Sequence, residues 1–249
     1  MFITKRHFIT ALLLSTIAIV TSISASPTYI HDIATQTIEG TASSPPFGWG
    51  YKYDIGFSNL EMNIQLQILL RGSAPDSSLL QTWEDGIENM WSKKFDVADR
   101  SFRYHINFDV SFTTEASGSI DQSVLVIDGQ GSGNMFNWYT ISDQGAEYNG
   151  QAAAHEFGHM LGLYDEYTSG MLDPSDFIDT TSIMGSLDGI TYTRHYQAFL
   201  DWLQPAANGR KLSLTAYDPD WVNPTIPEPA SAAIMTLGGL LFALKRRKR

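Results

Sequence analysis

The residues best suited to chemistry lie in one short stretch, between His155 and Glu166. His155 and His159 are four positions apart. On a helix their side chains would share one face, where both imidazoles can reach a single metal ion. Glu156 follows the first histidine and points about 100° around such a helix, so its carboxylate can reach a water molecule beside that ion. The spacing predicts a Zn²⁺ site with His155 and His159 as ligands and Glu156 as general base.

The third metal ligand is expected shortly after this helix. Gly162 can take backbone angles that other residues avoid, so the helix can end and the chain can turn back. Asp165, six residues after His159, can then return to the metal, and Glu166 competes with it for this role. No Glu occurs between Glu166 and Glu228, so a layout that uses a Glu from a later helix has no candidate. Three loop acids are weaker substitutes, expected to be solvated or to hold a structural Ca²⁺ ion: Asp173, Asp176 and Asp179.

A methionine in a turn of small residues follows downstream, in the sequence Thr181-Ser182-Ile183-Met184-Gly185. Together with the pattern His-Glu-x-x-His-x-x-Gly-x-x-Asp from His155 to Asp165, it resembles the metzincin zinc metallopeptidases, which place such a Met beneath their metal. The Asp in place of the more usual third His is similar to the snapalysin-type variant. The resemblance implies an endopeptidase that cleaves peptide bonds by metal-activated water, with Glu156 as general base.

The remaining tyrosines and histidines near the motif have weaker assignments. Tyr192 and Tyr196 follow the Met184 turn and are candidates to help bind an oxyanion. Relatives of the astacin type place an extra Tyr two residues after the turn Met, and here that position is Ser186. Three histidines of the body lack a partner pattern and are expected to be structural or surface residues: His31, His105 and His195.

The two ends of the chain predict export. Residues 1–25 resemble a secretory signal peptide, with two basic residues before an apolar stretch of about a dozen residues. At the other end, Pro227-Glu228-Pro229 precedes an apolar stretch, 230–244, and a run of Lys and Arg at 245–249. Residues 227–249 are similar to a PEP-CTERM sorting signal, which exosortase systems of Gram-negative bacteria recognise and remove.

The apolar stretch at 230–244 is shorter than the ~20 residues that span a bilayer comfortably. We therefore expect a transient inner-membrane anchor, with an ordinary C-terminal membrane tail as the alternative. Both interpretations place the body outside the cytoplasm, in the Gram-negative envelope or the medium. The PEP-CTERM resemblance adds an exosortase-type sorting enzyme to the expected partners.

The composition of the body excludes some functions. Residues 26–226 hold nine Lys and Arg against 26 Asp and Glu, a formal charge of −17, compared with −11 for the whole chain. Such a surface repels nucleic acid, so no nucleic-acid partner is expected. The chain has no Cys, which excludes a cysteine nucleophile and a cysteine-ligated zinc site. A body of this length can bury a sufficient core without disulfides.

Periodicity predicts the elements that position the motif. The expected order is strands at 58–70, 103–112, 123–128 and 135–141, a glycine-rich turn at 129–133, and helices at 76–95, 151–163 and 193–203. The strand near 134–141 is expected to border the cleft and could pair with an extended substrate. The domain plan is a leader or loosely packed arm at 26–49, a catalytic domain at 50–218 and a proline-rich linker at 219–229.

The metzincin resemblance implies an α+β, zincin-like fold. It has a twisted mixed sheet with a long helix and an active-site helix, above a smaller C-terminal subdomain that is mostly irregular or helical. A peptide or protein is the expected substrate. The alternatives are a catalytically silent extracellular matrix or surface protein on the same fold, and metal-dependent hydrolysis of another bond. The intact Glu156 favours an active enzyme, because a binding module has no need of a general base.

Overall fold

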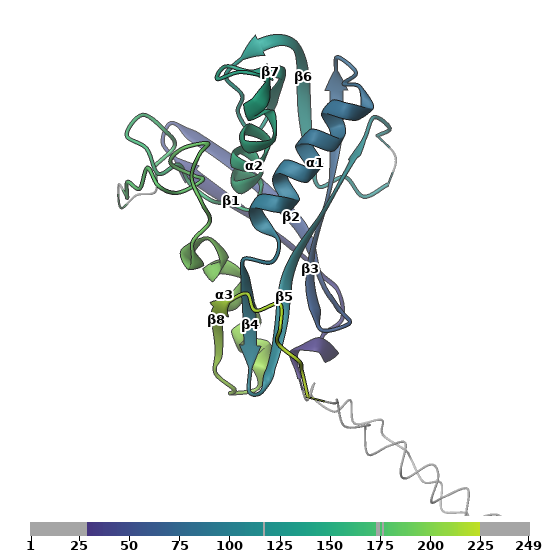
Figure 1. The fold of residues 1–249 in the computed structure, drawn as a ribbon, viewed down its shortest axis with the longest axis vertical. Helices are drawn as coiled ribbons and strands as arrows, with labels where there is room; N and C mark the ends of the chain where they lie inside the picture. Colours follow the sequence, from purple (N-terminus) through teal and green to yellow (C-terminus); the bar gives the residue numbers. More distant parts are fainter. Residues whose placement is uncertain (1–28, 117, 173–174, 176, 225–249) are drawn as a thin grey trace, which may run out of the picture.

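The computed structural model describes residues 29–116, 118–172, 175 and 177–224. The fold is mixed α+β, with a curled mixed sheet and a few helices (Figure 1). The strands are β1 (Gln36–Ser44), β2 (Phe47–Ser58), β3 (Glu61–Gly72), β4 (Phe95–Asp99), β5 (Phe102–Thr113), β6 (Gln122–Gly131), β7 (Asn137–Ser142) and β8 (Leu212–Ala216). The α-helices are α1 (Ser77–Trp91), α2 (Asn149–Met160) and α3 (Gln197–Leu203).

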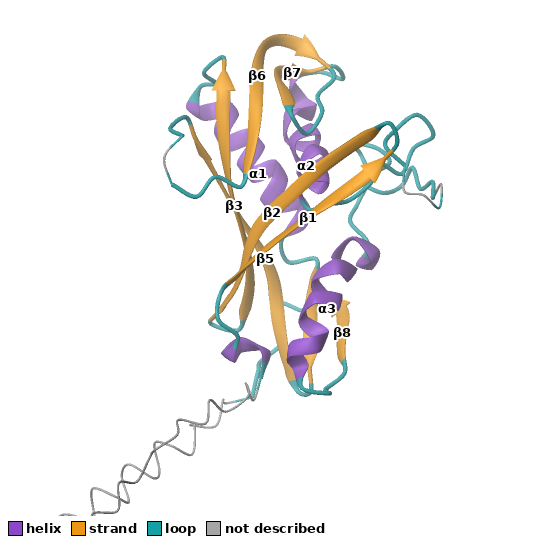
Figure 2. Ribbon diagram, turned by 180° about the vertical axis from the view of Figure 1, so that it is seen from behind, coloured by secondary structure: helices purple, strands orange, loops and turns teal. Residues whose placement is uncertain are grey.

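Strand β3 lies at the centre of the sheet and divides it. One edge of β3 pairs in parallel with β5. Along the other edge, β2 pairs antiparallel with residues 61–65, and β6 pairs in parallel with residues 68–72. The β1–β2 hairpin and the β6–β7 pair therefore follow one another along the same edge of β3 and then diverge (Figure 2). This divergence leaves room between them for the end of α2.

The core is built from alternating residues of the central strands and from the facing sides of α1 and α2, which lie side by side (Figure 1). A Cβ atom at Gly86 in α1 would collide with the backbone of Gly150 in α2, so only glycine allows the helices to approach this closely. Every second residue of the two longest central strands is buried, as their alternation predicts: Met62, Ile64, Leu66 and Ile68 in β3, and Tyr104, Ile106, Phe108 and Val110 in β5.

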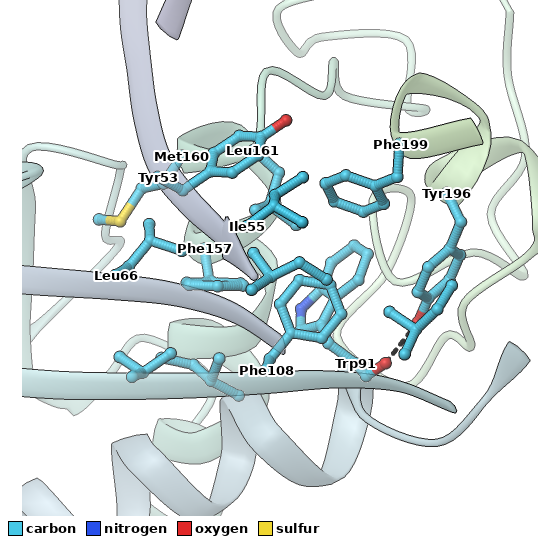
Figure 3. Packing of buried hydrophobic residues seen from close by; sticks show 14 of the residues in the cluster. Tyr53, Ile55, Leu66, Trp91, Phe108, Phe157, Met160, Leu161, Tyr196 and Phe199 are labelled. Atoms are coloured by element: carbon cyan, nitrogen blue, oxygen red, sulfur yellow. Dashed lines mark hydrogen bonds between the residues drawn. The ribbon is translucent and has the colours of Figure 1, made fainter. Parts of the chain in front are cut away.

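Trp91, the last residue of α1, connects three parts of the molecule (Figure 3). Its ring is fully buried, and its Nε1 donates a hydrogen bond to the Ala154 carbonyl of α2 at 2.9 Å. The Tyr196 hydroxyl, from the C-terminal part, donates to the Trp91 carbonyl at 2.7 Å. These two hydrogen bonds hold α2 and the C-terminal part against the same end of α1.

The part of the chain after α2 is shorter than the part before it and mostly irregular. The described residues between 161 and 192 form turns and isolated bridges, and a 3-10 turn at Thr193–Tyr196 leads directly into α3. Tyr196, Phe199 and Leu203 are buried, which confirms the predicted helix at 193–203 and its role in closing the core. After α3 the chain returns to the sheet, because β8 pairs antiparallel with β4.

Most predicted elements are confirmed, with shifted ends. The helix predicted at 76–95 is α1, and its N-cap Asp76 accepts a hydrogen bond from the Leu79 amide at 2.8 Å. The helix predicted at 151–163 is α2, which starts at Asn149 and ends at Met160. The strands predicted at 58–70, 103–112, 123–128 and 135–141 correspond to β3, β5, β6 and β7.

Two expectations are corrected, and the 219–229 linker stays a prediction. Residues 26–49 were expected to form a leader or loose arm, yet their described part contributes β1 and the start of β2, with Ile30 and Trp49 buried. The packed body therefore begins before residue 50. The glycine-rich turn at 129–133 is partly strand, because β6 continues to Gly131. In the described part of the 219–229 linker, Asn223 pairs with the backbone of Arg103 through two hydrogen bonds of 2.7 Å.

The predictions for the chain ends are not tested. The signal-like residues 1–25 and the sorting signal at 227–249, including the apolar stretch at 230–244, lie outside the described residues. Within the described part, none of the helices has the length and apolar character needed to cross a membrane.

Candidate metal centre

Helix α2 carries His155, Glu156 and His159, which line two neighbouring cavities. The run of Ala152, Ala153 and Ala154 favours a helix, because alanine has the highest helix propensity. The helix stops where expected: Gly162 has φ +91°, and its amide donates to the His159 carbonyl at 2.9 Å. The left-handed glycine lets the chain turn at once towards Asp165.

Both imidazoles are held by backbone carbonyls. Nδ1 of His155 lies 2.8 Å from the Ile183 carbonyl oxygen, and Nδ1 of His159 lies 2.8 Å from that of Leu163. A carbonyl only accepts, so each Nδ1 carries the proton and donates it, which leaves Nε2 as the nitrogen that could bind a metal ion. Trp49 supports this arrangement from β2, since its Nε1 donates to the His159 carbonyl at 2.9 Å.

Asp165 meets the two imidazoles at their Nε2 atoms. Its Oδ1 lies 3.1 Å from Nε2 of His155 and 3.3 Å from Nε2 of His159, and the side chain is only 3% exposed. Its other oxygen, Oδ2, accepts the Met171 amide at 2.6 Å, which fixes the carboxylate. Two ligands that each lie ~2.0–2.1 Å from a tetrahedral zinc ion are separated by roughly 3.3 Å. The two distances from Asp165 Oδ1 to the imidazole nitrogens are close to this value.

Glu156 is the second carboxylate at this site. The ligand atoms of His155, Glu156 and His159 all lie within 4.8 Å of one another, so this group could hold a metal ion. Asp165 brings a second carboxylate to the same two imidazoles, with Oδ1 at 3.1 and 3.3 Å from their Nε2 atoms. Oδ1 of Asp165 and Oε2 of Glu156 are both buried and have no hydrogen-bond partner. Buried carboxylate oxygens of this kind are costly unless something binds them.

The charges at the site depend on one another. Burial alone would lower the pKa of His155, but the Asp165 carboxylate, 3.1 Å from its Nε2, and the Glu156 carboxylate raise that pKa to about 9. Burial would raise the pKa of Asp165, yet the two imidazoles hold it well below its usual range. For Glu156, burial dominates and raises the pKa, although both imidazoles oppose this. Two carboxylates around two imidazoles thus make a site that favours positive charge.

Glu166 lies in a different environment from Asp165. It forms a bidentate ion pair with Arg194, with Oε1 2.9 Å from Nε and Oε2 2.8 Å from Nη2. Oε1 also lies 3.3 Å from Nε2 of His195. Burial would raise the pKa of Glu166, but Arg194 and His195 lower it to about 2. Asp179 pairs with the same Arg194 at 2.6 Å, so the structure separates both acids from the imidazoles of α2.

Among the described residues, the group on α2 is the one cluster of three or more His, Asp or Glu side chains that could hold a metal ion. The expected Ca²⁺ ion therefore finds no support from the described loop acids. Asp173 and Asp176 lie outside the described residues. The three histidines predicted to be structural each have an internal partner: His31 with Tyr104, His105 with Asp96, and His195 with Ser182 and Glu166.

Met184 lies against α2 at Gly158, a residue between the two histidines in sequence. Its side chain is fully buried, and a Cβ atom on Gly158 would collide with its Sδ. The preceding residue supplies the carbonyl that holds His155, and the Met184 carbonyl accepts the Glu166 amide at 2.8 Å. The turn therefore supports α2 by packing at Gly158, where the absent side chain leaves space for the thioether, and supports His155 by one hydrogen bond.

Two cavities meet at Glu156. One, of about 410 Å³, is lined by Glu156, His159 and Asp165 together with the start of β2 and residues 133–137. The other, of about 240 Å³, is lined by His155, Glu156, the end of β7 and residues 185–187. Gly133 and Tyr167 border both. A chain that passes from one cavity to the other must therefore pass Glu156.

Tyr167 is a site residue that the sequence reasoning missed. Its ring centroid lies 6.1 Å from that of His155, and burial, together with the Asp165 and Glu156 carboxylates, raises the pKa of its hydroxyl. Its position two residues after Asp165 is the signal that could have found it. The candidates proposed instead lie elsewhere: Tyr196 is in the core, and the Tyr192 hydroxyl contacts Thr181 at 2.7 Å.

Comparisons of the chain with models of known protein families, with curated proteins and with solved structures found no match. The function of this site must therefore be inferred from its own geometry and chemistry.

Proposed function

We propose that this protein is a zinc-dependent endopeptidase whose active site has a metzincin-like arrangement. The observation behind the proposal is the meeting of three potential ligand atoms: Nε2 of His155, Nε2 of His159 and Oδ1 of Asp165, with separations of 3.1 and 3.3 Å from the carboxylate. Each group is fixed from behind by a backbone hydrogen bond. A preorganised set of two imidazoles and one carboxylate suits a catalytic zinc ion, which keeps a further position open.

The residues of the chain would divide the work of peptide hydrolysis. When bound, zinc would act as a Lewis acid that lowers the pKa of water towards ~7 and polarises a carbonyl. Glu156, with its unpartnered Oε2 and raised pKa, is suited to take a proton from water and give it to the leaving amine. Tyr167 borders both cavities, so its hydroxyl is our candidate to donate a hydrogen bond to the carbonyl oxygen.

A peptide is the substrate that the surroundings of the site favour. The two cavities lie on either side of Glu156, which suits a chain that runs past the site in both directions. Among the described strands, β7 pairs only with β6. The Asn149 side chain already bonds the Thr140 carbonyl and the Ser142 amide, and Asn134 bonds the backbone of Asn137. An extended peptide would therefore add to β7 between these positions, beside Trp138 and Tyr139. This agrees with the expectation that the strand near 134–141 would border the cleft.

We propose export of this enzyme on the basis of the sequence alone. Residues 1–25 would direct secretion, and residues 227–249 would anchor the chain transiently through 230–244 until an exosortase-type enzyme removes the signal. The mature body would then act in the envelope of a Gram-negative cell or outside it. Pulse labelling of the full chain in such a host, with detection of a C-terminally shortened product, tests this part separately from the activity.

The decisive experiment separates binding of the metal from catalysis. The purified protein, loaded with Zn²⁺, is assayed on casein and on quenched fluorescent peptides, and its zinc content is measured. Glu156→Gln should keep zinc and lose activity by a factor of ~10³ or more, because the general base is absent but no ligand is lost. A zinc-loaded wild type that cleaves no peptide, or a Glu156→Gln variant with full activity, would refute the proposal. The first result would favour a silent surface protein or a hydrolase of another bond.

A further inference from the structure

The two cavities beside Glu156 differ in chemistry. The cavity on the side of residues 185–187 is bordered mainly by small and polar residues, among them Ser142, Gln144 and Ser186. The larger cavity shares Glu156, His159 and Asp165 with the candidate metal centre, and most of its large lining side chains are apolar or aromatic: Phe47, Trp49, Met135, Phe136 and Met171. The cleft is therefore apolar on one side of the reacting position and polar on the other.

The apolar side presents two large exposed aromatics. Phe47 is 59% exposed and Phe136 is 50% exposed, while Trp49 and Met135 beneath them are almost completely buried. Both aromatics border the same cavity, although they come from separate parts of the chain. Exposed apolar side chains that gather at one recess mark a binding surface rather than ordinary scatter.

The segment that presents Phe136 is well ordered by hydrogen bonds. Asn134 and Asn137 exchange two backbone hydrogen bonds of 2.9 and 3.0 Å around the tight turn that contains Met135 and Phe136. The Asn134 Oδ1 accepts from the Phe136 amide at 3.0 Å and from both nitrogens of Asn137 at 3.1 Å. Such a turn fixes the backbone that presents the aromatic ring, so less backbone entropy is lost when a ligand binds.

The opposite wall is formed by the β1–β2 hairpin. Phe47 is the first residue of β2 and pairs with Ser44, and Trp49 is anchored by its hydrogen bond to the His159 carbonyl. The wall is therefore attached to the helix that carries the candidate ligands. A side chain bound between Phe47 and Phe136 would lie at a fixed distance from Glu156.

We infer that this recess selects a large apolar side chain of the peptide substrate, aromatic or long aliphatic, next to the bond that is cleaved. The inference depends on the proposed peptidase function and adds its substrate class. The recess shares Glu156, His159 and Asp165 with the candidate metal centre, so its occupant is a residue adjacent to the reacting bond. A volume of about 410 Å³ is within the range of pockets that bury small ligands.

The test uses zinc-loaded full-length protein and a mixed peptide library whose cleavage sites are read by mass spectrometry. Cleaved bonds should share Phe, Tyr, Leu or Met at one fixed position beside the bond. Two fluorescent peptides that differ only there, Phe against Ala, then give a ratio of kcat/KM. Phe136→Ala should reduce that ratio about tenfold or more, because a hydrophobic subsite discriminates by tens of fold.

The matched control is Leu125→Ala. Leu125 is also a large exposed apolar residue near the same end of the sheet, but it borders neither cavity. It should leave the Phe-to-Ala ratio unchanged. A wild type that cleaves peptides without an apolar preference, or a Phe136→Ala variant that keeps the wild-type ratio, overturns this inference alone. A zinc-loaded wild type that cleaves no library peptide overturns the proposed function and this inference together.

Discussion

Asp165 and Glu166 are adjacent in sequence, but their buried carboxylates lie in different surroundings. Asp165 belongs to the histidine cluster, which consists of His155, Glu156, His159 and Asp165. Glu166 belongs to the arginine cluster, which consists of Glu166, Asp179, Arg194 and His195. In the arginine cluster both oxygens of Glu166 receive donors, at 2.8, 2.9 and 3.3 Å. In the histidine cluster, Oδ1 of Asp165 and Oε2 of Glu156 have none.

The difference teaches how to separate a structural ion pair from a functional site. A buried carboxylate that is fully hydrogen-bonded is explained by its partners and needs no ligand. A buried carboxylate oxygen without a donor, aimed at two imidazole nitrogens, costs free energy unless a cation completes it. Burial alone does not distinguish the two acids, because Asp165 is 3% exposed and Glu166 is 8% exposed.

The two clusters are nevertheless connected through one turn. The Glu166 amide donates to the Met184 carbonyl at 2.8 Å, and the carbonyl of the preceding residue, Ile183, holds Nδ1 of His155. The arginine cluster can therefore keep the turn in place while the histidine cluster uses it. Changes in the first cluster should affect folding, and changes in the second should affect the metal.

The largest expected effect, on zinc binding, comes from replacing each of the two acids with alanine in turn. Asp165→Ala should weaken zinc binding by more than about 100-fold, because even the loss of a partner behind a ligand costs 10–100-fold. Glu166→Ala should keep zinc at the wild-type stoichiometry when the protein is folded. Zinc is measured by atomic absorption after dialysis, with circular dichroism as the control for folding. Loss of zinc from the folded Glu166→Ala variant, but not from Asp165→Ala, would reverse the ligand assignment.

The second effect is on stability. Glu166→Gln keeps the shape of the side chain but removes the charge that Arg194 and His195 stabilise. We expect the free energy of unfolding to fall by about 2–3 kcal/mol, the contribution of hydrogen bonds to a charged group. Urea denaturation of the zinc-free protein gives the value. Asp179→Asn is the control: Asp179 shares Arg194 but is more exposed, so its loss should be smaller. Equal losses in the two variants would contradict the central place given to Glu166.

The same ion pair predicts a pH dependence. The pKa of Glu166 falls from an ordinary 4.5 to about 2 in the folded protein. A carboxylate with a lowered pKa stabilises the folded state above its unfolded pKa, and this stabilisation is lost as the pH falls towards the folded one. The stability difference between wild type and Glu166→Gln should thus be constant above about pH 5.5 and shrink between about pH 4.5 and 2. A chelator in the buffer ensures that release of metal does not contribute to the pH dependence. A stability difference between wild type and Glu166→Gln that stays constant down to pH 2 would contradict this role of the Glu166–Arg194 ion pair.

Local patterns in the sequence were enough to predict the histidine cluster. His155, Glu156 and His159 share a helix, and Asp165 follows His159 by six residues, after a single turn at Gly162. Their relative positions could therefore be predicted from sequence spacing alone. The same holds for α1, with its apolar periodicity and Asp76 cap, and for the alternation of β5. The metal-binding role of Asp165 stays a prediction, although the structure brings its carboxylate to both imidazoles.

Contacts between distant residues account for what the sequence did not indicate. The start of β2 is rich in glycine and was assigned to an arm, yet Trp49 contacts His159 across 110 residues. Strands β4 and β8 were missed, since β4 contains Asp96 and Asp99, which resemble surface acids. Both are fully buried, and their partners are His105 and Arg210. Arg194, which distinguishes Glu166 from Asp165, lies 28 residues from Glu166 and belongs to no recognisable motif.

The smallest expected effect concerns the side chain that lies between the clusters. Met184→Leu keeps the volume beneath α2 and leaves both backbone carbonyls of the turn in place, so stability should fall by less than about 1.5 kcal/mol. Zinc content and kcat/KM should stay near wild type, because the thioether packs against Gly158 without taking part in the proton transfer. Met184→Ala is the matched control, and the cavity it creates should cost about 2–5 kcal/mol. If the Leu variant lost activity while it kept its zinc and its stability, the sulfur itself would have to act on the histidine cluster.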